Sequence, residues 1–126
     1  MNLKQSLIDL AVREAKKSVH KHRLGCVIFD KKRLLSSNYN QPFNYSRKLH
    51  PRFRYWPTSI HAEVATILSA KTDLKGASLL VVRLNKADQL RMAKPCDYCM
   101  RYIEFVGIKR VWYSINHYPY FDTMSI

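Results

Sequence analysis

Two short stretches constrain the fold of this chain more than any other feature: His-Ala-Glu at 61–63 and Pro-Cys-Asp-Tyr-Cys at 95–99. Two cysteines in a C-x-x-C spacing fit the first turn of a helix, where both thiolates can bind one metal ion. A histidine from elsewhere in the chain can supply a further ligand. A fold that uses both stretches for one metal must bring the beginnings of two distant segments to the same point.

The residue types in these stretches indicate zinc. Zinc is bound by Cys and His side chains and prefers four ligands in a tetrahedron, so three protein ligands leave one position for water. In this chain the three ligands would be His61, Cys96 and Cys99. Zinc lowers the pKa of a bound water to near neutrality, and Glu63 follows His61 closely enough to take the proton. The residues therefore predict a catalytic zinc site.

The two stretches together match H-x-E…P-C-x-x-C, the signature of zinc-dependent base deaminases. On these residues the chain resembles the cytidine/deoxycytidylate deaminase family over most of its length. The resemblance implies a zinc-dependent hydrolase that converts cytosine to uracil and releases ammonia. It implies that His61, Cys96 and Cys99 are the zinc ligands, and that Glu63 moves the proton from the water to the ring nitrogen and assists the departure of ammonia.

The same resemblance implies two substrate contacts. Family members carry an asparagine at the end of the second strand that hydrogen-bonds the sugar hydroxyl and the base, and Asn40 takes this position here, with Asn38 as a competitor. The backbone amide of Ala62 stands where relatives contact the edge of the base. Asn40 and Ala62 are therefore expected to bind substrate, and a polar strand end without a ligand is the alternative for Asn40.

The segment 41–60 is unusual because it combines three prolines, several basic residues and several aromatic residues with no acidic residue. One arginine can bind a monophosphate, whereas several basic residues spaced along a groove with stacking aromatics would follow a nucleic-acid strand. We therefore expect substrate contacts from Arg52, Arg54 and Trp56. Stabilisation of the loop itself is the alternative role for these residues.

Hydrophobic periodicity predicts an alternation of helices and strands. Helices are expected at 3–21, 61–70 and 96–106, and strands at 24–29, 34–39, 78–84 and 110–114. A short polar turn after the first strand predicts an antiparallel pair, whereas strands joined through helices should be parallel. This order predicts an α/β protein. The resemblance implies the same three-layer α/β/α cytidine deaminase-like fold, as a single domain over residues 1–126 with a mixed sheet of four or five strands.

Two further expectations rest on local pattern. In the first helix, an apolar stripe of Ile8, Val12, Ala15 and Val19 should pack on the sheet. Residues 85–94 are expected to be a polar connector, and the residues after Ser114 to form either a short strand or a cap.

The charge indicates the class of partner. Lys and Arg total 22 against 9 acidic residues, a net charge of +13 in a chain of 126 residues. Such a charge attracts phosphate-bearing partners but does not separate a nucleotide from a nucleic acid. Two substrate hypotheses therefore stand: a free cytosine nucleotide, dCMP in particular, or a cytosine or adenosine within single-stranded DNA or tRNA.

Cysteine usage and hydrophobicity indicate the compartment. Three cysteines, two of them in a C-x-x-C, argue against a disulfide framework and for a reducing environment. The sequence shows no signal-peptide pattern and no apolar run near the ~20 residues that cross a bilayer. We expect a cytoplasmic protein that forms a homo-oligomer and has no membrane partner.

Three other interpretations would account for some of the cysteines and histidines. A structural zinc site would need a fourth ligand, such as Cys26, His50 or His117, and would leave Glu63 unexplained. A redox C-x-x-C is disfavoured because a proline precedes the first cysteine instead of separating the pair. A non-catalytic nucleic-acid-binding module with a structural zinc is the third. Cys26 itself is expected to be a small buried residue of the first strand.

Overall fold

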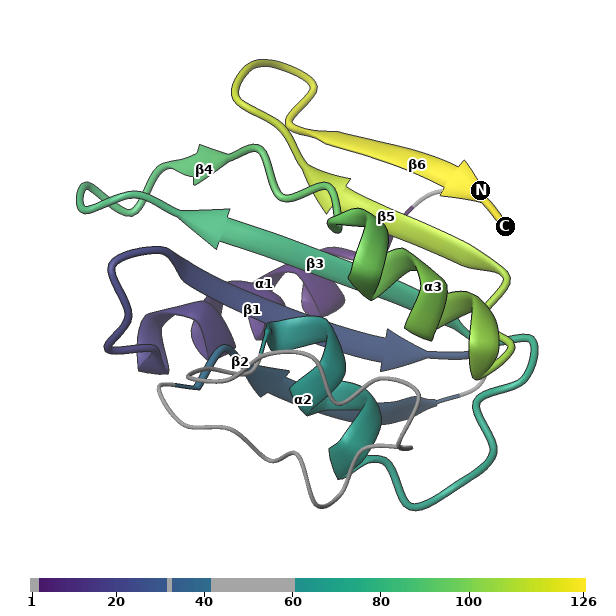
Figure 1. Cartoon of the computed structure of the whole chain (residues 1–126). Coiled ribbons are helices and arrows are strands. Elements are labelled where there is room, and N and C mark those ends of the chain that lie inside the picture. The colour runs from purple at the N-terminus through teal and green to yellow at the C-terminus, as the bar shows by residue number, and fades with distance from the viewer. Residues whose placement is uncertain (1–2, 32, 42–60) are drawn as a thin grey trace.

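The computed structural model describes residues 3–31, 33–41 and 61–126, and in these residues three helices alternate with six strands (Figure 1). The elements in chain order are α1 (Gln5–Lys17), β1 (Arg23–Phe29), β2 (Leu34–Tyr39), α2 (Ala62–Ser69), β3 (Ser78–Leu84), β4 (Leu90–Arg91), α3 (Asp97–Phe105), β5 (Arg110–Ser114) and β6 (Phe121–Ser125). The seven predicted helices and strands occur in the predicted order, and β4 and β6 are additional to them.

The strands form one mixed sheet in the order β2-β1-β3-β5-β6, with β4 paired to β3 beside this path. β1 is antiparallel to β2 and to β3, whereas β3 and β5 are parallel and are connected through α3. α1 covers one face of the sheet, and α2 and α3 lie side by side on the other (Figure 1). The structure is therefore the predicted three-layer α/β/α fold.

Alternation along the central strands divides the buried residues into two clusters. In β1, Cys26 and Ile28 point towards α2 and α3, whereas Val27 and Phe29 point towards α1. β3 divides in the same way, with Leu79 and Val81 on the α2–α3 side and its other apolar residues on the α1 side. Because both faces of these strands are buried, their sequences read as nearly continuous apolar runs.

α1 packs unusually close to β1 at Gly25. A Cβ at this position would overlap the carbonyl oxygen of Ala11 and lie 2.5 Å from the amide nitrogen of Ala15. Ala11 and Ala15 are both fully buried. Three small residues thus allow the helix backbone to rest directly on the strand backbone.

The structure corrects three of the predicted details. α1 ends at Lys17 instead of residue 21, because Ser18 adopts an extended conformation and its hydroxyl donates to the carbonyl of Asn40. Val19 therefore leaves the expected stripe and is 84 % exposed. The sheet has six strands where four or five were expected, because β4 forms within the predicted connector. After Ser114 the chain forms a short strand, β6, which is one of the two expected alternatives and pairs antiparallel with β5.

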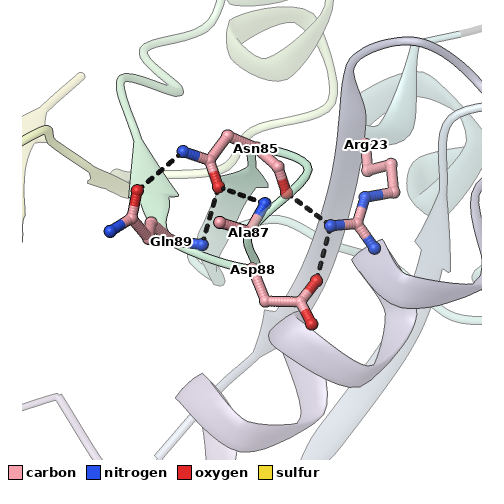
Figure 2. Close-up of polar contacts among 5 residues, drawn as sticks. All are labelled: Arg23, Asn85, Ala87, Asp88 and Gln89. Atoms are coloured by element: carbon pink, nitrogen blue, oxygen red, sulfur yellow. Dashed lines mark hydrogen bonds and ion pairs between the residues drawn. The ribbon is translucent and has the colours of Figure 1, made fainter.

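The turn between β3 and β4 is held by a polar network (Figure 2). The side-chain oxygen of Asn85 accepts from the amides of Ala87 and Gln89, both at 2.9 Å. Arg23 at the start of β1 donates to the Asn85 carbonyl and forms an ion pair with Asp88. This network ties the β3–β4 turn to β1 and so positions the chain that continues towards the Cys96–Cys99 motif.

In the described part of the chain, the helices are too short or too polar to cross a lipid bilayer.

Candidate active site

The two motifs lie at the N-termini of two helices. His61 is the N-cap residue of α2 and Cys96 is the N-cap residue of α3, and both have an extended backbone. The Sγ atom of Cys96 accepts from the amide of Cys99 at 3.4 Å, as an N-cap side chain does. Because helix N-termini favour negative charge, both positions stabilise thiolates and other anions.

The donor atoms of His61, Cys96 and Cys99 converge. The His61 Nδ1 atom lies 3.2 Å from Cys99 Sγ and 3.9 Å from Cys96 Sγ, and all three donor atoms lie within 4.8 Å of one another. Around a tetrahedral zinc ion, ordinary bond lengths separate such N and S atoms by about 3.6 Å and two sulfurs by about 3.8 Å. The donor set therefore fits zinc in both chemistry and spacing.

The protonation of the two cysteines differs. Hydrogen bonds from Cys99 and His61 lower the pKa of Cys96 to about 3. The hydrogen bond to Cys96, together with burial, raises the pKa of Cys99 well above its ordinary value. The hydrogen bond to Cys96 also raises the pKa of His61. These opposite shifts favour the thiolate form of Cys96 and the protonated form of Cys99, and binding of a dication would favour release of the proton of Cys99.

Glu63 lies beside this cluster at the second residue of α2. Its side chain is almost fully buried, at 3 % exposed, and burial raises the pKa of its carboxyl. Cys26 packs close to the same site, where burial and then the charge of Glu63 raise the pKa of its thiol. Cys26 is fully buried, which confirms its predicted place in the core.

A cavity of about 310 Å³ opens onto these residues. Its lining residues are His20, His22, Leu24, Asn40, His61, Ala62, Glu63, Arg83, Met92, Ala93, Lys94 and Cys96. Ala62 and Glu63 are buried, whereas His20, His22 and Lys94 are exposed, so the cavity runs from a basic mouth to the buried carboxylate. Its size suits one nucleotide-sized ligand.

The two asparagines at the end of β2 are placed differently. Asn40 lines the cavity and is 7 % exposed, and its Oδ1 accepts from the Leu24 amide at 3.0 Å while its Nδ2 donates to the His22 carbonyl at 2.7 Å. Asn38 is not among the lining residues, and its Nδ2 donates to the Ser69 hydroxyl at 2.7 Å. Of the two candidates, the structure brings only Asn40 to the cavity.

The other predicted site residues divide into two groups. Ala62 lines the cavity together with His61, Glu63 and Cys96. Arg52, Arg54 and Trp56 lie outside the described residues.

The fourth ligand that a structural zinc site would need is not found in the described ranges: Cys26 and His117 do not join the cluster, and His50 lies outside those ranges.

The sequence interpretation missed the basic lining residues His20, His22, Arg83 and Lys94. A signal for Arg83 was present, because it interrupts the apolar run of β3 at a position that alternation assigns to the same face as Leu79 and Val81. The run His-Lys-His-Arg at 20–23 was a second signal. These residues can be assigned to one cavity only when β1 and β3 are known to be neighbours.

Comparison with known proteins agrees with this geometry. The model of the cytidine and deoxycytidylate deaminase zinc-binding region matches residues 1–115. A search of curated protein sequences found no match.

Solved structures with the same fold include two of the dCMP deaminase from cyanophage S-TIM5. The apo form has a TM-score of 0.57 and 16 % identity, over 90 % of this chain and 86 % of that one. The complex with dCMP and dUMP has a TM-score of 0.55 and 15 % identity, over 92 % and 86 %. A structure from a study of A-to-I editing by tRNA:A34 deaminases has a TM-score of 0.51 and 23 % identity, over 91 % and 78 %.

At these identities the solved structures establish a shared fold, and the family assignment rests on the match over residues 1–115. That match includes both motifs whose side chains converge here. The chain belongs to the cytidine and deoxycytidylate deaminase family, and its cofactor is zinc.

Proposed function

We propose that the protein removes the exocyclic amino group of a cytosine nucleotide, dCMP in particular, by hydrolysis, to give the uracil nucleotide and ammonia. The observation that carries this proposal is the convergence of His61, Cys96 and Cys99 at a cavity that is lined by His61, Cys96 and the buried Glu63. The choice of a nucleotide is supported by a cavity of about 310 Å³ and by the fold shared with a dCMP deaminase.

In this proposal His61, Cys96 and Cys99 hold the zinc. When bound, zinc would act as a Lewis acid and lower the pKa of a water molecule at the position that the protein leaves open. Cys96 is prepared for this role because its pKa is already about 3. Cys99 loses its proton only on binding the metal, so zinc affinity should rise with pH.

Glu63 is proposed to be the proton carrier. It takes a proton from the attacking water, passes it to the ring nitrogen next to the reacting carbon, and then assists the departure of ammonia. Burial raises the pKa of its carboxyl, which brings the pKa closer to the operating pH and suits a group that must both accept and donate a proton.

Ala62 and Asn40 are proposed to orient the substrate. The amide of Ala62 belongs to the first turn of α2, where backbone N–H groups have no partner within the helix, so it can donate to the base. Asn40 donates one hydrogen of Nδ2 to the His22 carbonyl, and an amide nitrogen carries a second hydrogen that can reach the sugar hydroxyl.

A second candidate function is deamination of a cytosine or adenosine within single-stranded DNA or tRNA. The net charge of +13 favours it, because a strongly basic protein attracts polynucleotides. The fold shared with a tRNA deaminase structure is compatible with it.

An ammonia-release assay distinguishes the two candidates. Zinc-loaded protein is incubated with cytidine, deoxycytidine, dCMP, dCTP, adenosine and single-stranded oligonucleotides. We expect dCMP to be the best substrate, and turnover only of oligonucleotides would support the second candidate. Release of ammonia from none of the substrates would refute both.

Substitution of Glu63 tests the proton-transfer role. Glu63→Gln should keep its zinc and lose about 10²–10⁴-fold in turnover, because it removes the acid–base group and little else. Glu104→Gln is the matched control, since Glu104 is exposed on α3. Normal turnover by Glu63→Gln would show that another group carries the proton.

A further inference from the structure

Three basic side chains gather at the mouth of the cavity. His20 and His22 lie between α1 and β1, and Arg83 lies near the end of β3. An Arg83 Nη donates to His22 Nδ1 at 2.9 Å, and the amide of His22 donates to His20 Nδ1 at 3.1 Å. All three side chains line the cavity that contains Glu63. They form one connected basic cluster beside the candidate catalytic residues.

The position of Arg83 is unusual for a cation. Its neighbours on the same face of β3, Leu79 and Val81, are fully buried, and Arg83 itself is half-buried opposite Leu24 of β1. Within the described ranges its side chain contacts a histidine and has no carboxylate partner, since the ion pairs found there join Glu14 to Lys17 and Arg23 to Asp88. A half-buried guanidinium is stabilised by an anion, so a ligand is the expected partner.

The cluster presents donors to that ligand. A guanidinium only donates, so His22 Nδ1 must accept from Arg83, and a neutral His22 then carries its proton on Nε2. Burial and the charges of Arg83, Lys21 and His20 all lower the pKa of His22, which indicates a positive potential at this point. The Nε2–H group of His22 and the remaining N–H groups of Arg83 can donate to one shared acceptor.

The cluster is also held in place before any ligand binds. Asn40 donates from Nδ2 to the His22 carbonyl and accepts at Oδ1 from the Leu24 amide. The hydroxyl of Ser18 donates to the Asn40 carbonyl at 3.4 Å and accepts from the His20 amide at 3.2 Å. The end of β2 thus fixes both sides of the histidine segment, which reduces the ordering that ligand binding requires.

We propose that His20, His22 and Arg83 form a phosphate subsite that binds the 5′-phosphate of the nucleotide whose base reacts beside Glu63. This inference rests on the proposed function and deepens it. The charge distribution fits such a ligand, because the only carboxylate among the described lining residues is the buried Glu63 and the mouth is basic. Guanidinium and imidazole donors match the oxygens of a phosphate monoester.

The compactness of the cluster favours a single phosphate over a strand. Binding of single-stranded nucleic acid uses basic and stacking groups distributed along a groove. Here the three side chains come from one segment and one adjacent strand and meet at one point of the mouth. A mononucleotide places its single phosphate at one end, as this arrangement requires.

Kinetics with matched substrates test the subsite. The values of kcat/KM for dCMP, deoxycytidine and a single-stranded oligodeoxynucleotide are measured for the zinc-loaded wild type and for Arg83→Gln. We expect Arg83→Gln to lower kcat/KM for dCMP by about 10- to 100-fold, the effect of losing a charged hydrogen bond. The value for deoxycytidine, which has no phosphate, should stay within about 2-fold of wild type because the lost contact is to the phosphate alone.

Control variants separate local binding from overall charge and from folding. Arg13→Gln removes the same charge from an exposed position of α1 and should leave kcat/KM unchanged for both dCMP and deoxycytidine. His22→Gln is a second test if Arg83→Gln folds poorly, with the exposed His117→Gln as its control. An equal loss with dCMP and deoxycytidine would overturn the proposal, as would a loss confined to the oligonucleotide.

A binding measurement keeps the subsite distinct from the reaction. Inorganic phosphate is titrated into zinc-loaded protein while the histidine ring signals are followed by NMR. Phosphate should shift the signals of His20 and His22 in the wild type and not in Arg83→Gln. Such shifts without any deamination would support the subsite and refute the proposed function. Deamination of dCMP without such shifts, and without preference over deoxycytidine, would support the deamination reaction and refute the phosphate subsite.

Discussion

The close approach of α1 to β1 leads to a quantitative prediction for Gly25→Ala. The added Cβ would overlap the carbonyl oxygen of Ala11, and would lie 2.5 Å from the amide nitrogen and 3.1 Å from the Cα of Ala15. All three are backbone atoms, so no side-chain rotation can relieve the overlap. The helix and the strand must therefore separate by about 1 Å to restore ordinary van der Waals contact.

The magnitude follows from the packing that this separation weakens. Ala11 and Ala15 belong to the same buried cluster as Val27, Leu80 and Val82. A gap of about 0.5–1 Å removes about a quarter to a half of each dispersion contact. Overpacked cores lose about 1–3 kcal/mol, and we expect about 3 kcal/mol here because the added atom meets backbone. For a chain of this length, the melting temperature should fall by about 10–15 °C.

Thermal unfolding of the zinc-loaded protein, followed by far-UV circular dichroism, measures this shift. Gly76→Ala is the control, because nothing lies within 4 Å of the added Cβ and only the left-handed backbone at φ +81 opposes the substitution. That strain costs about 1–2 kcal/mol, so Gly25→Ala should lower the melting temperature clearly more. An equal or smaller fall for Gly25→Ala would refute the argument that α1 rests directly on the backbone of β1.

Two further predictions concern the candidate site. Burial raises the pKa of Glu63, so the metal-free folded protein holds this proton more tightly than the unfolded chain, and the stability due to Glu63 declines as the pH rises through the raised pKa. Metal-free Glu63→Gln should therefore have a higher melting temperature than the wild type at mildly alkaline pH, and this difference should shrink at mildly acidic pH. A difference in melting temperature that does not depend on pH would contradict the raised pKa of Glu63. Cys99→Ala should lose most of its zinc by metal analysis, because two ligands bind the ion far more weakly than three. Cys26→Ala, which changes a buried cysteine outside the cluster, should keep about one zinc per chain, and equal zinc loss in both variants would refute the proposed ligand set.

Elements with a strong local pattern were predicted well. The strands 34–39, 78–84 and 110–114 were predicted with the bounds that the structure has. Their apolar residues alternate or run continuously between turn residues, and this pattern does not depend on the partner strand. The antiparallel first pair and the parallel β3–β5 pair followed from the lengths of their connections.

Elements created by a tertiary contact were not predicted. α1 stops at Lys17 because the hydroxyl of Ser18 binds the carbonyl of Asn40, a residue far along the chain. β4 has only two residues, and its strand character comes from pairing with β3 and not from its own composition. In both cases the deciding interaction joins segments that no local window contains.

The candidate site divides in the same way. The chemical groups could be predicted from residue types and spacing, because metal coordination and proton transfer depend on the identity of the side chain. On that basis the sequence predicts His61, Cys96 and Cys99 as zinc ligands and Glu63 as the proton carrier, and the structure brings the three donor atoms of the predicted ligands together. Which residues surround these groups depends on how the strands and helices pack together. Arg83 reaches the cavity because β3 pairs with β1 opposite Leu24, and strand order depends on the packing of the whole sheet.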